Sequence, residues 1–157
     1  MINTLSQKER DIISSFQENI PVNIGDLSRK FGVNAYIADL GDDISGQIIR
    51  DTDNDVFKIS VAKSDNRHEQ RFTAAHELSH FLLHKNEIGD GIVDSPLYRS
   101  KLSNKIEVEA NKLAADILMP YKKIDIVIED GVRTLEELAK YFDVSVQAMK
   151  VRLGIPV

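Results

Sequence analysis

The stretch RFTAAHELSHFLLH, residues 71–84, constrains the fold of this chain more than any other. It belongs to a segment, residues 67–84, whose pattern predicts one long helix. Residues i and i+4 share a helix face, so His76 and His80 can both present a ring nitrogen to one metal ion. Catalytic zinc usually has three protein ligands and a water. The fold must therefore bring a third ligand from another segment.

Glu77 follows the first of these histidines and is rotated by about 100° from it on the helix. From there it reaches a metal-bound water more readily than the metal, which is the position of a general base beside zinc. The alternative explanation is a helix with surface histidines, or with core histidines that have partners in the protein. These five residues alone leave both explanations open.

The third ligand is sought in a predicted helix over residues 106–119, which offers Glu107 and Glu109. The face of Glu109 is charged and is the predicted solvent face, with Lys105, Lys112 and Asp116. The face of Glu107 is the predicted inward face, with Ala110, Asn111, Ala114 and Leu118. A carboxylate on an inward face is costly unless it is paired or binds a metal. Glu107 is therefore the predicted third ligand, and Glu109 a solvated charge.

Two other polar residues are candidates for supporting roles. Asn111, one turn after Glu107, can hydrogen-bond the second ring nitrogen of a histidine ligand and fix its tautomer; the alternative is an amide in a helix contact. His84 lies two turns after His76, and three ligands from one helix are nearly collinear. We therefore expect His84 to cap the helix C-terminus or to line the site. His68, among charged residues, is expected to be exposed.

A hydrolytic zinc site usually has a further donor to the developing oxyanion. The sequence offers Arg71, Tyr98, Arg99 and Tyr121 and does not choose among them. Arg71 lies about one turn before the metal motif, so the alternative for this residue is an ion pair with a carboxylate.

Composition restricts the remaining possibilities. A length of 157 residues fits one domain, and the net charge of −5 gives no bulk attraction to nucleic acid or to an anionic membrane. The chain has no cysteine, so a metal must be held by histidine, carboxylate or water. It has no apolar stretch long enough to span a membrane and no signal-like N-terminus. We expect a cytoplasmic protein.

The predicted fold class is α+β, with a small, mostly antiparallel sheet packed on the metal-motif helix. Three segments make up the single expected domain, 1–157: N-terminal helices and sheet (1–65), zinc-site helices (66–120) and a C-terminal helical segment like a helix–turn–helix (121–157). The elements expected besides the two zinc-site helices are helices at 7–17, 23–33, 134–142 and up to Gly154, and strands at 33–38, 45–50 and 56–61. The last two strands form a predicted hairpin, with 56–61 at the sheet edge as a place for peptide to add. Residues 85–104 are predicted to be a loop.

Three runs, RFTAAHELSH, EVEANKLAADILMP and LAKYFDVSVQAMKVRL, resemble in order and spacing the ImmA/IrrE family of zinc metallopeptidases. The resemblance implies that His76, His80 and Glu107 bind Zn²⁺ and that Glu77 is catalytic. Ser79 stands where the family usually has glycine and adds a side chain that can bond back to a carbonyl. Leu113 stands where phenylalanine is common. Neither departure removes a ligand.

The resemblance implies a zinc endopeptidase of bacterial or phage origin that cleaves or regulates a helix–turn–helix repressor encoded nearby. Two alternatives stay open: a partner-binding component of a toxin–antitoxin-like pair, and a DNA-binding transcriptional regulator. Nucleic-acid binding is not favoured, because residues 132–157 are nearly neutral and the last helix offers only Lys150 and Arg152 as cations. No membrane partner is expected.

Overall fold

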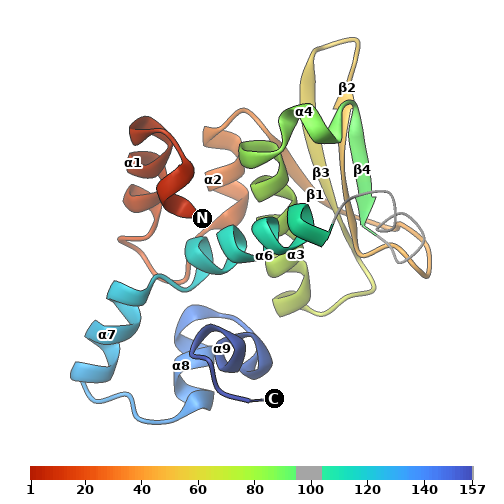
Figure 1. Ribbon diagram of the computed structural model, residues 1–157. Helices are drawn as coiled ribbons and strands as arrows, with labels where there is room; N and C mark the ends of the chain where they lie inside the picture. The colour runs from red at the N-terminus through yellow and green to blue at the C-terminus, as the bar shows by residue number, and fades with distance from the viewer. Residues whose placement is uncertain (95–103, 157) are drawn as a thin grey trace.

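The structure is a computed structural model that describes residues 1–94 and 104–156. A four-stranded sheet stands at one side, α3 lies against it, and the C-terminal helices extend on the other side (Figure 1). The N-terminal part contains η1 (Ile2–Thr4), α1 (Gln7–Phe16), α2 (Ile24–Lys30), β1 (Asn34–Ala38), β2 (Gly46–Asp51) and β3 (Val56–Ala62). The remainder contains α3 (Arg67–Leu83), α4 (Lys85–Ile88), β4 (Gly91–Asp94), α6 (Asn104–Leu118), α7 (Tyr121–Glu129), α8 (Leu135–Phe142) and α9 (Val146–Arg152).

The sheet confirms the predicted α+β class. Its strand order is β1-β3-β2-β4; β1 pairs with β3 in parallel, and the other two pairings are antiparallel. The predicted hairpin is β2–β3, but its second strand is not at an edge. β1 occupies the outer side of β3, so the two edges are β1 and β4. The alternating pattern of residues 56–61 predicted a buried face and carried no information about lateral partners.

The prediction of a loop over residues 85–104 is wrong in part. Residues 85–88 form α4 and residues 91–94 form β4, while 95–103 lie outside the described residues. Gly91 has a φ of +144°, and a Cβ there would lie 2.8 Å from the Cα of Ile49. A glycine is therefore what allows this short strand to start against β2.

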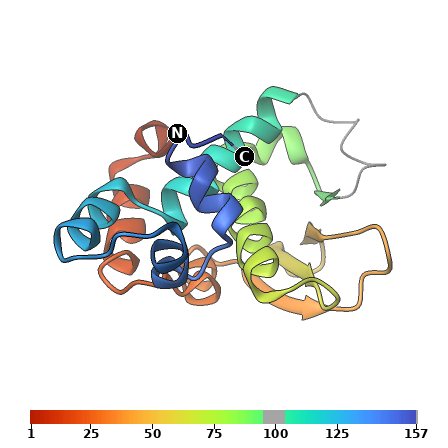
Figure 2. The same cartoon turned by 90° about the horizontal axis from the view of Figure 1, so that it is seen from below.

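Helix α3 is the centre of the packing. All residues from Thr73 to His80 are buried, because β2 and β3 contact the helix from one side and α6 from another (Figure 2). The N-terminus of α3 is capped by Asn66, whose side chain accepts from the backbone N–H of Glu69. Ser6 and Glu9 form a capping box at the start of α1. Within the described residues, no helix combines the length and apolar character needed to cross a bilayer.

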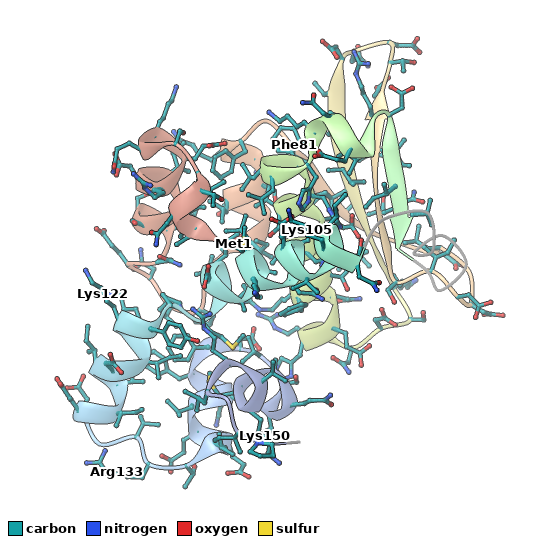
Figure 3. All side chains as sticks on the ribbon, viewed as in Figure 1. Met1, Phe81, Lys105, Lys122, Arg133 and Lys150 are labelled. Carbon is teal, nitrogen blue, oxygen red and sulfur yellow. The ribbon has the colours of Figure 1, made fainter. Side chains whose placement is uncertain are left out.

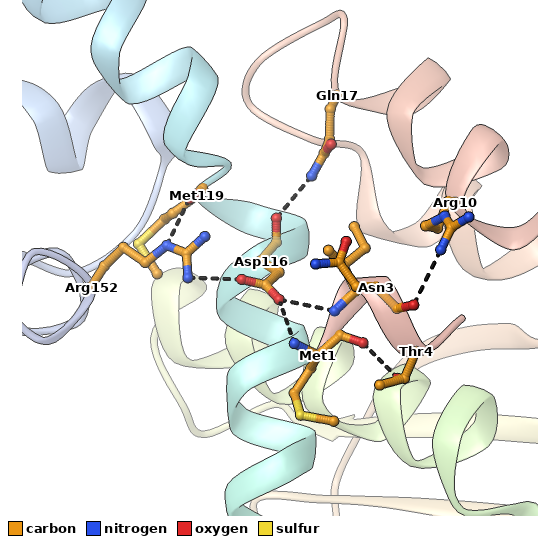
Figure 4. Close-up of polar contacts among 9 residues, drawn as sticks. Met1, Asn3, Thr4, Arg10, Gln17, Asp116, Met119 and Arg152 are labelled. Atoms are coloured by element: carbon orange, nitrogen blue, oxygen red, sulfur yellow. Dashed lines mark hydrogen bonds and ion pairs between the residues drawn. The ribbon is translucent and has the colours of Figure 1, made fainter. Parts of the chain in front are cut away.

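Asp116 joins the end of α6 to both chain termini (Figure 4). Its carboxylate accepts from Nη1 of Arg152 at 2.9 Å and from the backbone N–H of Ile2 at 3.2 Å. Nε of Arg152 donates to the carbonyl of Met119 at 2.8 Å. The expectation that Asp116 faces solvent is therefore wrong: its side chain is 18% exposed and fixes α9 on α6.

Asp143 joins the C-terminal helices to α3. Its carboxylate accepts from Nε of Arg67 at 2.7 Å and from Nε2 of His68 at 3.0 Å, and Nε of Arg71 donates to its backbone carbonyl at 3.0 Å. Burial raises the pKa of Asp143, but the hydrogen bond from Arg67 and the charges of Arg71 and Arg67 outweigh burial and lower it. Nε of Arg71 also lies 3.4 Å from Oδ2 of Asp143, so Arg71 pairs with a carboxylate, which was the alternative raised for it. His68 is only partly exposed.

We predict that Asp143→Asn lowers the free energy of unfolding by about 1–3 kcal/mol, because Arg71 loses its countercharge in a largely buried position. Asparagine tolerates the left-handed φ of +55° at this residue, so the change isolates the charge. Because the pKa of Asp143 is lowered, the difference from wild type is complete at neutral pH and shrinks as pH falls below about 4. Urea unfolding across this pH range measures it.

Asp55→Asn is the matched control. Asp55 also has a left-handed φ, of +53°, and also pairs with an arginine, but its side chain is 76% exposed. We expect a smaller effect of this substitution. Equal losses in the two variants would contradict the assigned role of Asp143.

Candidate metal centre

Three potential ligands converge where α3 crosses α6. One donor atom from each of His76, His80 and Glu107 lies within 4.8 Å of the others. The carboxylate oxygens of Glu107 are 3.2 Å from Nε2 of His76 and 3.1 Å from Nε2 of His80. The two Nε2 atoms are 3.1 Å apart. Two imidazoles and a carboxylate turned toward one point form a donor set that suits zinc.

The predicted inward face of α6 explains how Glu107 reaches α3. Ala110, Ala114 and Leu118 are fully buried, and small side chains let two helices approach closely. His76 and His80 are buried on the facing side of α3. Glu107 is half-buried at this crossing, so one of its sides remains open to the neighbouring cleft.

A hydrogen bond orients His76 within the cluster. Oδ1 of Asn111 is 2.8 Å from Nδ1 of His76. An amide oxygen only accepts, so Nδ1 carries a proton, and the contact turns the ring so that Nε2 faces Glu107. This is the contact expected of Asn111 as an orienting residue.

The local electrostatics favour the protonation states that metal ligands need. Burial raises the pKa of Glu107, but the hydrogen bonds from His76 and His80 outweigh it and hold the pKa well below its usual range. Burial lowers the pKa of His80. A charged carboxylate and a neutral imidazole are both ready to bind a cation.

Glu77 lies one residue beyond His76, fully buried between α3 and the sheet. Gly46 of β2 lies beside it: a Cβ there would overlap Cγ2 of Thr73, lie 3.1 Å from the carbonyl of Ser60 and 3.8 Å from Cγ of Glu77. The missing side chain at Gly46 therefore lets α3 lie close on β2 beside Glu77. Gly46 was not predicted as a site residue; a glycine near the start of the predicted strand 45–50 was the available signal.

The cluster opens onto a cleft of about 1010 Å³ between α3, α6 and α9. His76, Glu107 and Asn111 line this cleft. Its α9 side is formed by Gln147, Ala148, Val151 and Arg152, with Val144 and Ser145 before them. The C-terminal helices thus form a wall of the cleft that contains the candidate site.

The structure separates the candidate oxyanion donors. Tyr121 lines the cleft, but its hydroxyl donates to the carbonyl of Arg152 at 3.0 Å. Arg71 does not line the cleft; its Nη1 donates to the carbonyl of Val22 at 2.9 Å, and its Nε to that of Asp143. Neither is placed as an oxyanion donor. Tyr98 and Arg99 lie outside the described residues.

His84 is the C-cap residue of α3, which is one of the two roles expected for it, but its side chain and that of Glu109 make contacts that were not expected. His84 is buried behind His80, with its Nδ1 3.0 Å from Nδ1 of His80, on the side of that ring opposite Glu107. It therefore neither binds at the cluster nor lines the cleft. Glu109 is not a solvated charge, because its carboxylate lies 3.3 Å from Nε2 of His84. Helical periodicity correctly predicted that Glu109 and Glu107 lie on different faces of α6. It could not predict that the side chain of His84, from another helix segment, contacts the carboxylate of Glu109.

Ser79 fits the fully buried position between the two histidine ligands. Its hydroxyl donates to the carbonyl of Ala75, one turn earlier, at 2.7 Å. The added side chain thus satisfies its own polar group within α3 and makes no demand on the neighbouring helix.

The fold agrees with comparisons to known proteins. A model of the peptidase M78 family, described as the IrrE N-terminal-like domain, matches residues 27–154. The chain belongs to this family of peptidases, as its motifs indicated. No curated protein is similar enough in sequence to be matched.

Among solved structures, a Mycobacterium tuberculosis transcriptional regulator is similar, with a TM-score of 0.63 and 19% sequence identity. The match covers 98% of this chain and 48% of the regulator, so this chain spans about half of the regulator's length. At this identity the similarity shows a shared fold.

We predict that Glu107→Gln weakens zinc binding by more than the roughly 10–100-fold loss typical of removing an outer partner, because it removes a charged ligand. Competition with a chromophoric chelator measures the dissociation constant. Glu69→Gln is the control, since Glu69 is an exposed carboxylate on α3 that lines the same cleft. Equal zinc affinity in the Glu107 variant and the control would exclude Glu107 as a ligand.

We also predict that Gly46→Ala lowers the free energy of unfolding by about 1–3 kcal/mol, because the new methyl group overpacks the contact of α3 with β2. Thr73→Ser removes the overlapping Cγ2 and should restore part of the loss in the double variant. Gly25→Ala is the control, because a Cβ there meets only one atom within 4 Å, at an ordinary 3.6 Å. Thermal or urea unfolding checks all three. Wild-type stability of Gly46→Ala would show that the contact is looser than described.

Proposed function

We propose that this protein is a zinc-dependent endopeptidase. The observation that carries the proposal is the convergence of His76, His80 and Glu107 beside the buried Glu77, at the wall of a cleft large enough for a peptide segment. Membership of the peptidase M78 family supports the same reaction class.

Each of these residues has a defined part in the proposed hydrolysis. His76, His80 and Glu107 would hold the ion, and Asn111 keeps Nε2 of His76 turned toward it. Zinc, when bound, supplies Lewis acidity to the scissile carbonyl and to the attacking water. Glu77 takes a proton from that water and returns it to the leaving nitrogen. Glu77 is fully buried, so bulk solvent does not compete for its carboxylate.

The proposed substrate is a protein, a helix–turn–helix repressor or another partner encoded nearby in a bacterial or phage genome. Family resemblance supports this substrate class, and the name of the similar M. tuberculosis protein, a transcriptional regulator, agrees with a role in regulation. A substrate segment in the cleft would contact α9 through Gln147, Ala148 and Val151. An extended segment could also add to a sheet edge, which is β1 or β4.

A DNA-binding role for the C-terminal helices has less support. Arg152 is committed to Asp116 and lies 3.7 Å over the ring of Tyr121, so it is not available to a phosphate. Lys122 on α7, Arg133 between α7 and α8, and Lys150 on α9 lie at separate places in the view of Figure 3. We propose that α9 serves the cleft. A partner-binding, toxin–antitoxin-like role remains the second candidate, since α9 and the cleft also offer a surface to a partner.

We predict that Glu77→Gln abolishes cleavage, with a loss of about 10²–10⁴-fold in rate, while zinc binding persists, because the variant loses only the proton acceptor. The purified protein is incubated with zinc and with the helix–turn–helix repressor encoded beside its gene, and products are identified by mass spectrometry. A chelator should stop wild-type cleavage, and added zinc should restore it.

Cleavage that persists in the Gln variant would overturn the proposed mechanism. Zinc binding with stable repressor association but no cleavage would favour the partner-binding role. A salt-dependent shift of duplex DNA at near-physiological salt would revive the DNA-binding role.

A further inference from the structure

A chain of hydrogen-bonding groups extends from the candidate metal centre away from the cleft. Nε2 of His80 faces Glu107 at 3.1 Å, and Nδ1 of the same ring is 3.0 Å from Nδ1 of His84. Nε2 of His84 is in turn 3.3 Å from a carboxylate oxygen of Glu109. Both imidazoles are buried, whereas the side chain of Glu109 is 27% exposed.

The chemistry of these groups allows one direction for the protons when a metal is bound. A neutral His80 that binds through Nε2 carries its proton on Nδ1, which must then donate. Nδ1 of His84 therefore accepts, and the proton of His84 resides on Nε2. That N–H points at Glu109, whose carboxylate only accepts. Each N–H in the chain from His80 through His84 therefore donates to an acceptor, and the last acceptor is the negatively charged carboxylate of Glu109.

We propose that His84 and Glu109 position His80 as a metal ligand, acting together as a carboxylate–imidazole pair behind it. The inference rests on the proposed metal site and adds two positioning residues to it. His84 fixes the tautomer and ring orientation of His80, and Glu109 fixes those of His84. Outer hydrogen bonds of this kind raise the basicity of a ligand.

The two histidine ligands are therefore supported unequally. Behind His76 stands a neutral amide, Asn111, whereas behind His80 stands an imidazole backed by a carboxylate. The charge of Glu109 lies on the far side of His84, so it acts on the metal through two hydrogen bonds and does not occupy a ligand position. The alternative is that His84 only fills space in the core, which would make its hydrogen-bonding atoms irrelevant.

Two substitutions of His84 separate these explanations. An asparagine places its amide oxygen where Nδ1 of histidine lies and retains an acceptor for His80. A glutamine places its terminal amide where Nε2 lies and retains only the contact with Glu109. A positioning role predicts that His84→Gln weakens zinc binding by roughly 10–100-fold and that His84→Asn loses less. Glu109→Gln keeps the shape and removes the charge, and should weaken binding by a few-fold to roughly tenfold.

Zinc affinity is measured by competition with a chromophoric chelator. His68→Gln is the matched histidine control, because His68 lies on the same helix and contacts Asp143. Glu69→Gln is the carboxylate control and lies on the cleft side of the same helix. Neither control should change the affinity by more than about twofold. Circular dichroism of the metal-free proteins verifies that every variant folds.

A spectroscopic readout distinguishes positioning from packing. Imidazole ¹⁵N NMR of the zinc-loaded protein should show His84 as the neutral tautomer with its proton on Nε2, and His80 with its proton on Nδ1. In Glu109→Gln the Nε2 signal of His84 should shift. The opposite tautomer of His84 in the wild type would overturn the proposal.

The outcomes also separate this inference from the proposed function. If the wild type binds zinc and cleaves its substrate, but His84→Gln and Glu109→Gln bind zinc as the controls do, the positioning role is wrong and the peptidase assignment stands. If the wild type binds no zinc, the metal site itself is wrong and the positioning role fails with it. The proposal is supported if His84→Asn loses some zinc affinity and His84→Gln loses more.

Discussion

The contact between α3 and α6 is the constraint on which the rest of the structure depends. It holds two imidazoles and a carboxylate with donor atoms within 4.8 Å of one another in a largely buried position. Such a concentration of polar groups is costly unless they are paired or bind a cation. The surrounding fold supplies the means: alanines on α6 allow close approach, Asn111 orients His76, and Gly46 lets α3 lie close on the sheet.

The C-terminal helices complete the site without contributing a ligand. Asp143 anchors them to the start of α3 through Arg67, His68 and Arg71, and Arg152 anchors α9 to Asp116 at the end of α6. Held at both places, α9 forms a wall of the cleft beside the cluster. Arg152, one of the two cations of the last helix, is used here for attachment. This explains how a segment with that helical spacing serves a peptidase domain.

Much of the site could be predicted from the sequence because its signals are local. Two histidines at i and i+4 share a face, and the periodicity of residues 106–119 distinguished Glu107 from Glu109. The β2–β3 hairpin was predicted for the same reason. What could not be predicted depends on contacts between distant segments. Three such contacts require knowledge of which elements meet. They are the parallel pairing of β1 with β3, the contact of His84 with Glu109, and the pairing of Arg71 with Asp143.

The most direct test of the central claim is zinc K-edge X-ray absorption spectroscopy of the zinc-loaded protein. We predict two imidazole nitrogens at about 2.0–2.1 Å, oxygen ligands at about 2.0–2.2 Å and no sulfur. The outer-ring scattering should correspond to His76 and His80, and one imidazole should disappear when either is replaced. A metal environment made of oxygen alone, or one unchanged by replacement of these histidines, would contradict the account.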